Sequence, residues 1–112
     1  MAKTPDRNNG VMNGATEVVL VDDPGVGAQH FFTGARFQNK DTVQHTWTVS
    51  LKDASANLLK IGEALILEAG VGAPFKVDGF DVCQDGETVV AVLEGAHTTT
   101  APRFWSSWIR ST

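Results

Sequence analysis

Three histidines are the side chains in this sequence best suited to proton transfer or metal binding near neutral pH. They are His30, His45 and His97, and none has a second His or Cys at the close spacing of a zinc site. His45 alternates with Trp47 on the apolar side of a segment of period two, which favours a hydrogen-bonded core histidine over a metal ligand. The sequence therefore predicts no metal centre built on histidine.

Other motif-like stretches lack the residues that would complete them. The segment from Asp23 to Gly27, DPGVG, resembles a phosphate-binding loop. No Gly-Lys-Ser/Thr and no helix start follows it, so a phosphate would find neither the lysine nor the helix N-terminus. Ser106 and Ser107 have no Gly-x-Ser-x-Gly elbow and no evident base. Four acidic residues cluster in the sequence: Asp78, Asp81, Asp85 and Glu87. Their spacing departs from that of an EF-hand loop and is typical of hairpin ends, although a calcium site remains an alternative there. We expect no enzyme activity, no catalytic residue, no metal and no cofactor.

Composition narrows the class of protein further. The 112 residues are 42% hydrophobic and 20% charged, as in an ordinary soluble domain. A net charge of −4 argues against nucleic-acid or anionic-membrane binding, which need clustered Lys and Arg. Cys83 is the single cysteine and has no intrachain disulfide partner. The polar start, residues 1–15, lacks the apolar core of a signal peptide, so we expect synthesis in a cytoplasm.

Short alternating segments separated by turn residues predict an all-β fold. The clearest is Thr42–Leu51, where apolar residues alternate with Thr, Ser and Gln. Leu58–Leu67 fits a helix nearly as well, but its strand neighbours favour two short β segments with a bend near Gly62. Further strands are predicted at Thr16–Val21, Gln29–Gln38, Pro74–Phe80, Thr88–Leu93 and Pro102–Ile109, with a tight turn at Asp85-Gly86. We predict a single jelly-roll-like β-sandwich over residues 16–112, preceded by a flexible N-terminal arm at residues 1–15.

The last predicted strand is apolar on both sides. Alternation puts Phe104 and Trp108 on one face and Trp105 and Ile109 on the other. A sandwich core covers only one face of a strand, so either a loop or another subunit must cover the second. Because Trp is enriched at interface centres, we favour an oligomer interface formed from these four residues.

Two stretches resemble small virion structural proteins of tailed phages. They are Phe32–Thr42, FTGARFQNKDT, followed by the strand around Trp47, and Ile61–Gly70, IGEALILEAG. The resemblance is to β-sandwich modules of head decoration, fibre and tail-associated proteins. It lies in a Thr/Val-rich strand followed by a Leu-rich segment that closes on Ala-Gly, and it covers roughly residues 16–95.

The resemblance implies a multicopy capsid decoration (cement) protein on the virion surface. Such a protein would form a homo-oligomer, commonly a trimer, and bind the assembled lattice of a major capsid protein. The N-terminal arm would then be the capsid-binding segment, with candidate contacts Lys3, Pro5, Arg7, Val11 and Met12. Two alternatives stay open: a receptor- or glycan-binding module with an exposed Trp platform, and a small enzyme whose site only the fold assembles.

Overall fold

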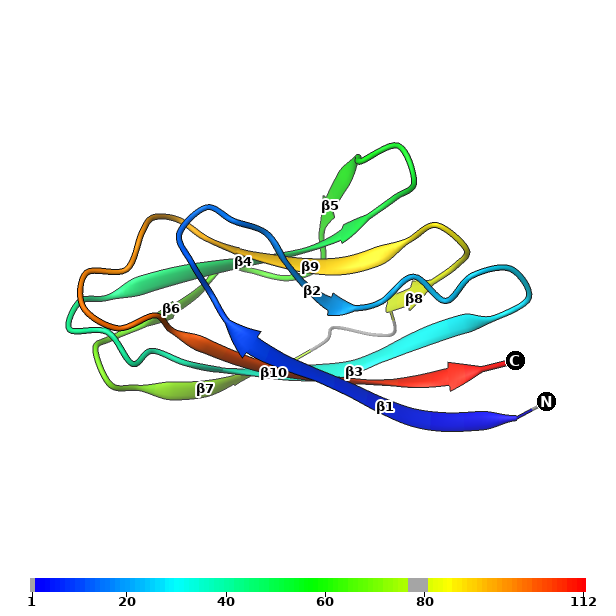
Figure 1. The fold of residues 1–112 in the computed structure, drawn as a ribbon, viewed down its shortest axis with the longest axis horizontal. Coiled ribbons are helices and arrows are strands. Elements are labelled where there is room, and N and C mark those ends of the chain that lie inside the picture. Colours follow the sequence, from blue (N-terminus) through cyan, green and yellow to red (C-terminus); the bar gives the residue numbers. More distant parts are fainter. Residues whose placement is uncertain (1, 77–80) are drawn as a thin grey trace.

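Ten β-strands and no helix make up the part of the chain that the computed structural model describes, residues 2–76 and 81–112 (Figure 1). The strands are β1 (Lys3–Val11), β2 (Val18–Val21), β3 (Gln29–Gln38), β4 (His45–Lys52), β5 (Leu58–Lys60), β6 (Leu65–Leu67), β7 (Gly72–Phe75), β8 (Asp81–Cys83), β9 (Thr88–Leu93) and β10 (Arg103–Ser111). The predicted all-β class is confirmed.

The strands form two antiparallel sheets that face each other as a sandwich (Figure 1). Sheet A has the order β1-β10-β3-β7, with β8 also paired to β3; sheet B has the order β2-β9-β4-β5, with β6 also paired to β4. Because β7 and β8 follow one another along β3, and β5 and β6 along β4, each pair acts as one interrupted strand. Each sheet thus has four strand positions, in the connectivity of a jelly roll, as predicted.

The core lies between the sheets and is closed by large aromatic side chains. Trp47 of sheet B and Trp108 of sheet A are among its largest fully buried members. Around them pack other apolar residues from both sheets, including Met12, Leu20, Val21, Phe32, Phe37, Val49, Leu93 and Phe104. One polar position faces inward from β10, where the Ser106 hydroxyl donates to the Leu20 carbonyl at 2.6 Å and so joins the two sheets.

The N-terminal residues differ from the flexible arm expected of them. Residues 3–11 form β1, which pairs in unbroken register with β10. Met12, directly after the strand, is fully buried and its sulfur accepts a hydrogen bond from the Trp47 indole. A strand at the edge of a sheet can keep polar side chains in water while its backbone pairs, so the polar composition that suggested an arm is equally that of an edge strand.

The edges of sheet A at β1 and at β7 resist the addition of another strand. At the two ends of the β1–β10 pair, the Thr112 N–H bonds to the Ala2 carbonyl and the Met12 N–H bonds to the Pro102 carbonyl. Because the pattern alternates along β1, the backbone N–H and C=O groups of its even-numbered residues bond to β10, and those of its odd-numbered residues point to the free edge. At that edge Pro5 has no N–H. The two N–H groups beyond it, of Arg7 and Asn9, are capped by the side chains of the residues before them, at 2.8 and 2.9 Å.

The opposite edge of sheet A carries a proline in the equivalent orientation. The Asn39 N–H bonds to the Val71 carbonyl, and the alternation continuing along β7 points Pro74 away from β3. Proline at outward positions is a common protection against edge-to-edge pairing. Contacts with another molecule are therefore expected to use the faces of sheet A and not its β1 and β7 edges.

Local predictions in the middle of the chain have mixed outcomes. The two short segments around a bend near Gly62 are confirmed as β5 and β6, and the Asp85-Gly86 turn is confirmed by the Gln84–Glu87 backbone bond. The bend needs glycine because a Cβ at Gly62 would lie 2.6 Å from the ring of Phe75. The predicted strand Pro74–Phe80 corresponds to β7 at its start, and its residues 77–80 lie outside the described residues.

Candidate functional site

The outer face of sheet A is built from rows of side chains that lie opposite one another across the strands. One row is Asn9, Trp105, Arg36 and Pro74; the next is Arg7, Ser107 and Gly34; a third is Pro5, Ile109, Phe31 and Val82. The middle row is small, because Gly34 has no side chain and Ser107 has a short one. A trough therefore runs across the strands between an aromatic, cationic row and an apolar row.

The trough has a defined shape because the backbone is irregular at this point. The β3–β10 register shifts at Ser107, so that Thr33 and Gly34 both lie opposite it, and Gly34 has φ of 147°. The Thr33 and Ser107 hydroxyls lie 2.7 Å apart and hydrogen-bond across the floor. The resulting groove has a volume of about 860 Å³.

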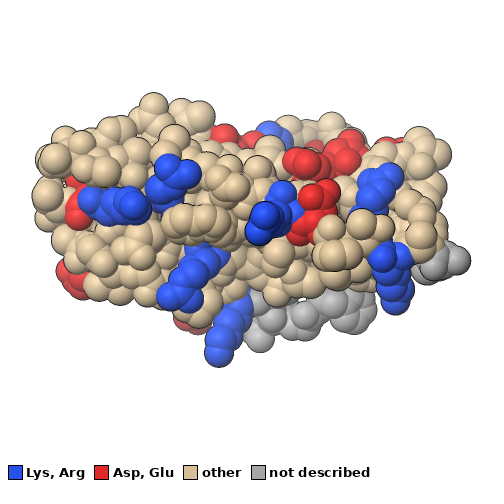
Figure 2. Space-filling view, turned by 60° about the horizontal axis from the view of Figure 1, so that its bottom comes forward, with Lys and Arg blue, Asp and Glu red and all other residues tan. Residues whose placement is uncertain are grey.

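Positive charge gathers on this face although the whole chain is acidic. Four of the nine Lys and Arg residues occupy outward positions on strands of sheet A, namely Lys3, Arg7, Arg36 and Arg103, whereas Asp6 and Arg110 lie at inward positions. Figure 2 brings this layer forward and shows Lys and Arg side chains spread along most of its length. Arg7, Arg36 and Lys76 line the groove, and none of the described residues lining it is Asp or Glu. The groove is therefore suited to a negatively charged ligand.

A second, smaller hollow lies on the same face beside the termini. It has a volume of about 380 Å³ and is lined by Lys3, Pro5, Phe31 and Ile109. Its walls are apolar apart from the lysine. This hollow brings together residues that the sequence suggested separately, Lys3 and Pro5 as arm contacts and Ile109 as an interface residue.

The remaining predicted contact residues divide between the surface and the core. Trp105 is 42% exposed and lies in the groove together with Arg7, whereas Phe104 and Trp108 are buried in the sandwich and cannot contact another subunit. Met12 is likewise in the core, and Val11 is exposed at the end of β1. The outward face of β10 is therefore Trp105 and Ile109, as alternation predicts, and its inward face belongs to the core.

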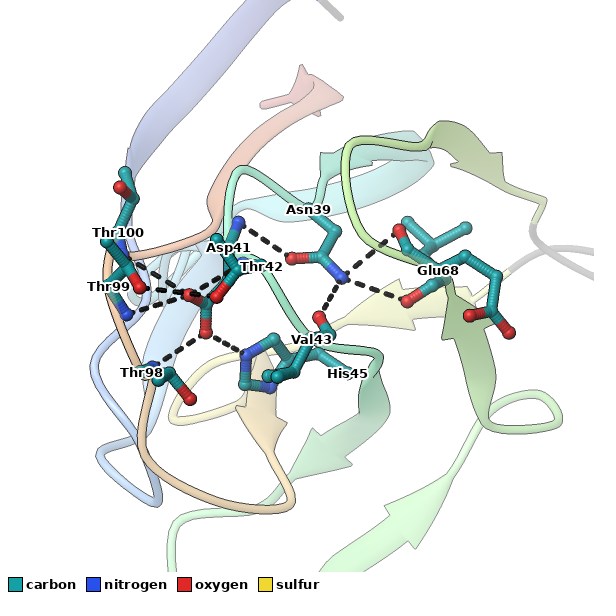
Figure 3. A network of polar contacts seen from close by, with 10 residues as sticks. Asn39, Asp41, Thr42, Val43, His45, Glu68, Thr98, Thr99 and Thr100 are labelled. Carbon is teal, nitrogen blue, oxygen red and sulfur yellow. Dashed lines mark hydrogen bonds and ion pairs between the residues drawn. The ribbon is translucent and has the colours of Figure 1, made fainter.

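A buried carboxylate at one end of the sandwich is the most concentrated polar cluster (Figure 3). The Asp41 side chain accepts hydrogen bonds from His45 Nε2 at 2.7 Å, from Thr42 N, and from the three consecutive backbone N–H groups of residues 98–100. Burial raises the pKa of Asp41, but the bonds from His45 and these backbone groups outweigh it and hold the pKa well below its ordinary value. The carboxylate therefore ties two distant loops together as an anion at neutral pH.

Asn39 completes this cluster by joining it to the β6–β7 loop (Figure 3). Its side-chain amide nitrogen donates to the carbonyls of Val43, Leu67 and Glu68, and its oxygen accepts the Asp41 N–H at 3.0 Å. Asn39 is fully buried and His45 is 3% exposed. Although Asp41 and His45 form a pair typical of acid–base catalysis, neither is open to a substrate, so the geometry supports a structural role.

Other candidates for chemistry take structural positions. His30 is buried, with Nδ1 donating to the Asp22 carbonyl at 2.7 Å and Nε2 accepting from Arg110 at 2.9 Å, because a carbonyl only accepts and a guanidinium only donates. Asp23 accepts the N–H groups of Gly25 and Gly86, which lower its pKa and hold the DPGVG segment as a turn. Within residues 2–76 and 81–112 no group of three His, Cys, Asp or Glu side chains could hold a metal ion; Asp78 of the acidic cluster lies outside the described residues. No helix in this part of the chain could cross a membrane.

Sequence reasoning missed Arg36, Lys76 and Phe31 as members of the surface hollows. Arg36 and Phe31 are five residues apart in β3, so strict alternation would place them on opposite faces of the sheet. The bulge between them shifts the alternation by one residue and brings both to the outer face. Lys76 follows β7, whose pairing with β3 across the chain brings it to the groove. Only the spatial order of the strands assembles these residues.

Comparison with known proteins shows the fold. No family model and no curated protein matches the sequence. A chain of the Bacillus endospore appendages, described as a novel family of disulfide-linked pili, superimposes with a TM-score of 0.55 over 99% of this chain and 87% of its own length, at 14% identity. PirA matches with a TM-score of 0.48 at 12% identity, covering 94% of this chain and 92% of PirA. A chain of infectious bursal disease virus, Gx strain, matches with a TM-score of 0.47 at 10% identity, covering 96% of this chain and 31% of the viral one. The chain therefore shares its β-sandwich fold with a protein of the Bacillus endospore appendages.

Proposed function

We propose that this chain is a non-enzymatic structural protein of a virion surface, a capsid decoration subunit that packs in several copies on the outside of an assembled shell. The observation that carries the proposal is the apolar row Pro5, Ile109 and Phe31, which lies on the uncovered outer face of a rigid sheet. Apolar side chains aligned across three strands are costly to leave in water and favour contact with another molecule.

The chemistry of the site also supports a structural role. The Asp41–His45 pair is buried and fully engaged in holding loops, and the exposed hollows present Arg, Lys, Trp and hydroxyl groups without a paired acid and base. Such surfaces bind, whereas general acid–base catalysis needs groups of matched pKa that reach a substrate. A binding and assembly role therefore fits the surface better than catalysis.

The mode of assembly follows from the edges and the cysteine. Prolines and capped N–H groups protect the edges of sheet A at β1 and β7, so copies are expected to meet through side chains on its outer face. Cys83 is fully buried, so a disulfide between copies would require the fold to open. We expect a non-covalent homo-oligomer, of which a trimer is the stoichiometry we favour, bound to a capsid lattice by many repeated weak contacts.

The test is native mass measured with matched variants. Light scattering on the 12.0 kDa chain should give a multiple of that mass, and the double variant Phe31→Thr, Ile109→Thr should give the monomer. Threonine is β-branched and therefore suits an outward strand position at both sites. The control is Ile66→Thr on β6, a 56% exposed isoleucine on sheet B, which should leave the mass unchanged.

Two results would count against the proposal. A wild-type protein that stays monomeric at high concentration and fails to bind assembled phage shells would remove its basis. Loss of the oligomer on Ile66→Thr, but not on Phe31→Thr with Ile109→Thr, would move the interface to sheet B.

A further inference from the structure

The groove beside Trp105 is a candidate ligand site separate from the apolar row. Its floor is Ser107 and Gly34, and one wall is the row Asn9, Trp105 and Arg36. Neighbouring strands lie about 4.8 Å apart, so the four-strand row from β1 to β7 spans roughly 14 Å. This is an elongated trough that runs perpendicular to the strands, and it suits a linear ligand.

The aromatic wall is a partly exposed tryptophan on a strand that is paired on both sides. Trp105 lies on β10, which is paired on both sides, by β1 and by β3. Its side chain is 42% exposed, and the Arg103 guanidinium lies 5.9 Å from the ring centroid. The exposed part of the indole offers apolar surface to a ligand, and strand pairing on both sides fixes its backbone position.

The polar groups around this ring are cations and hydrogen-bonding groups that suit an acidic sugar. Arg36 lies directly opposite Trp105, and Arg7 and Lys76 line the same groove. Guanidinium groups bind carboxylates and sulfates through paired N–H donors. The Thr33 and Ser107 hydroxyls and the Asn9 amide can donate or accept, as recognition of sugar hydroxyls requires.

We propose that this groove binds a linear acidic polysaccharide, with Trp105 stacking on the apolar face of a sugar ring and Arg36, Arg7 and Lys76 pairing with its acidic groups. The observations favour a sugar over an acidic peptide. An extended peptide gains most from backbone bonding to a sheet edge, and the two edges that flank this groove, β1 and β7, are protected. A polysaccharide makes no use of those edges and is recognised by side chains on the face. The site does not depend on the assembly role proposed above.

The test is titration calorimetry with defined probes. A hexamer of galacturonic acid and a heparin-derived hexasaccharide present carboxylate and sulfate groups respectively, maltohexaose is the neutral sugar, and hexaglutamate is the acidic peptide. At least one acidic sugar should bind, and saturation should shift the tryptophan emission, since Trp47 and Trp108 are buried and only Trp105 is accessible. Comparison of the two acidic sugars identifies the preferred acidic group.

Variants locate the site. Trp105→Ala should weaken binding by about tenfold or more, with thermal melts confirming that the protein stays folded. Lys76→Gln should weaken it by roughly twofold to fivefold, and Lys60→Gln, the same change on β5, should have no effect. Added salt should weaken binding of the acidic sugar, because exposed charges are screened.

Several outcomes would overturn the proposal. Equal binding of maltohexaose would mean that the cations play no part, and equal or tighter binding of hexaglutamate would reassign the groove to an acidic protein segment. Absence of binding by both acidic sugars would reject a polysaccharide site. Binding that survives Trp105→Ala, or that falls equally with Lys60→Gln and Lys76→Gln, would place the ligand elsewhere. None of these results bears on the native mass measured for the assembly role.

Discussion

The two buried tryptophans should respond differently to the same substitution. Trp47 and Trp108 are 0% and 1% exposed and face one another's sheets across the core. The Trp47 indole N–H donates to the sulfur of Met12, whereas no side chain or backbone group of the described residues accepts from the buried Trp108 N–H. Comparing the same substitution at Trp47 and at Trp108 therefore measures the free-energy cost of burying an indole N–H that has no acceptor.

The size of the difference follows from that contrast. Trp→Phe removes the same atoms at both sites, so the loss of apolar area and the small cavity contribute similarly to each variant. Trp108→Phe also removes a buried N–H that lacks an acceptor, which recovers roughly 1–3 kcal/mol, while Trp47→Phe gains nothing of the kind and loses a weak bond to sulfur. Trp47→Phe should therefore be the more destabilising by about 1–3 kcal/mol.

Urea denaturation followed by far-ultraviolet circular dichroism measures both free energies of unfolding without relying on tryptophan emission. For a chain of this size roughly 4 °C of melting temperature corresponds to 1 kcal/mol, so thermal melts of the two variants should differ by about 4–12 °C. Equal melts, or a larger loss for Trp108→Phe, would refute the reasoning. That result would mean that the Trp108 N–H makes a favourable contact, for which the His30 ring, 5.7 Å away between centroids, is the nearest aromatic candidate.

Three further predictions test other parts of the structure. Met12→Ala should lower the free energy of unfolding by about 2–5 kcal/mol, while Val11→Ala, one residue earlier, should change it by about 0.5 kcal/mol or less. Urea denaturation measures both values, and if residues 1–15 were a flexible arm neither variant would change the free energy of unfolding. The pKa of Asp41 is lower in the fold than its ordinary value of 3.8, so its contribution to stability is present above that value and is lost as the pH falls toward the folded pKa. Asp41→Asn should therefore lower the melting temperature at pH 7 and flatten the decline of the melting temperature between pH 4 and 2. An unchanged slope would show that Asp41 does not carry this stability. Gly62→Ala should cost about 1–3 kcal/mol because its Cβ would meet the buried Phe75 ring, and a Phe75→Leu background, which removes that ring, should reduce the loss.

The strand pattern was readable from the sequence wherever one face is buried and the other is wet. The predicted strand Thr42–Leu51 covers β4 except for its last residue, Lys52. The two faces of β10 are divided as alternation requires, with Phe104 and Trp108 inside and Trp105 and Ile109 outside. Period-two hydrophobicity is a local property that the chain carries in any context. The same reasoning found the bend at Gly62, because glycine interrupts a helix more than it interrupts a pair of short strands.

The N-terminal segment was harder to read because its side chains contribute little to the core. Residues 3–11 are polar and mostly exposed even when paired, so their order comes from backbone bonds to β10, which lies at the other end of the sequence. Composition reports side-chain burial and does not report backbone pairing. Met12 was the available signal, as an apolar residue isolated in a polar stretch.

By itself the sequence determined the all-β class, the approximate positions of most strands and the absence of a recognisable catalytic motif, since these depend on residue type and short spacing. Only the tertiary structure decided which strands lie side by side. That order puts Arg36 opposite Trp105, brings Arg7 and Lys76 to the same groove, and joins Pro5, Ile109 and Phe31 in one apolar row. Pairing between strands remote in the chain has no local signature, because it depends on how the two sheets jointly cover one core.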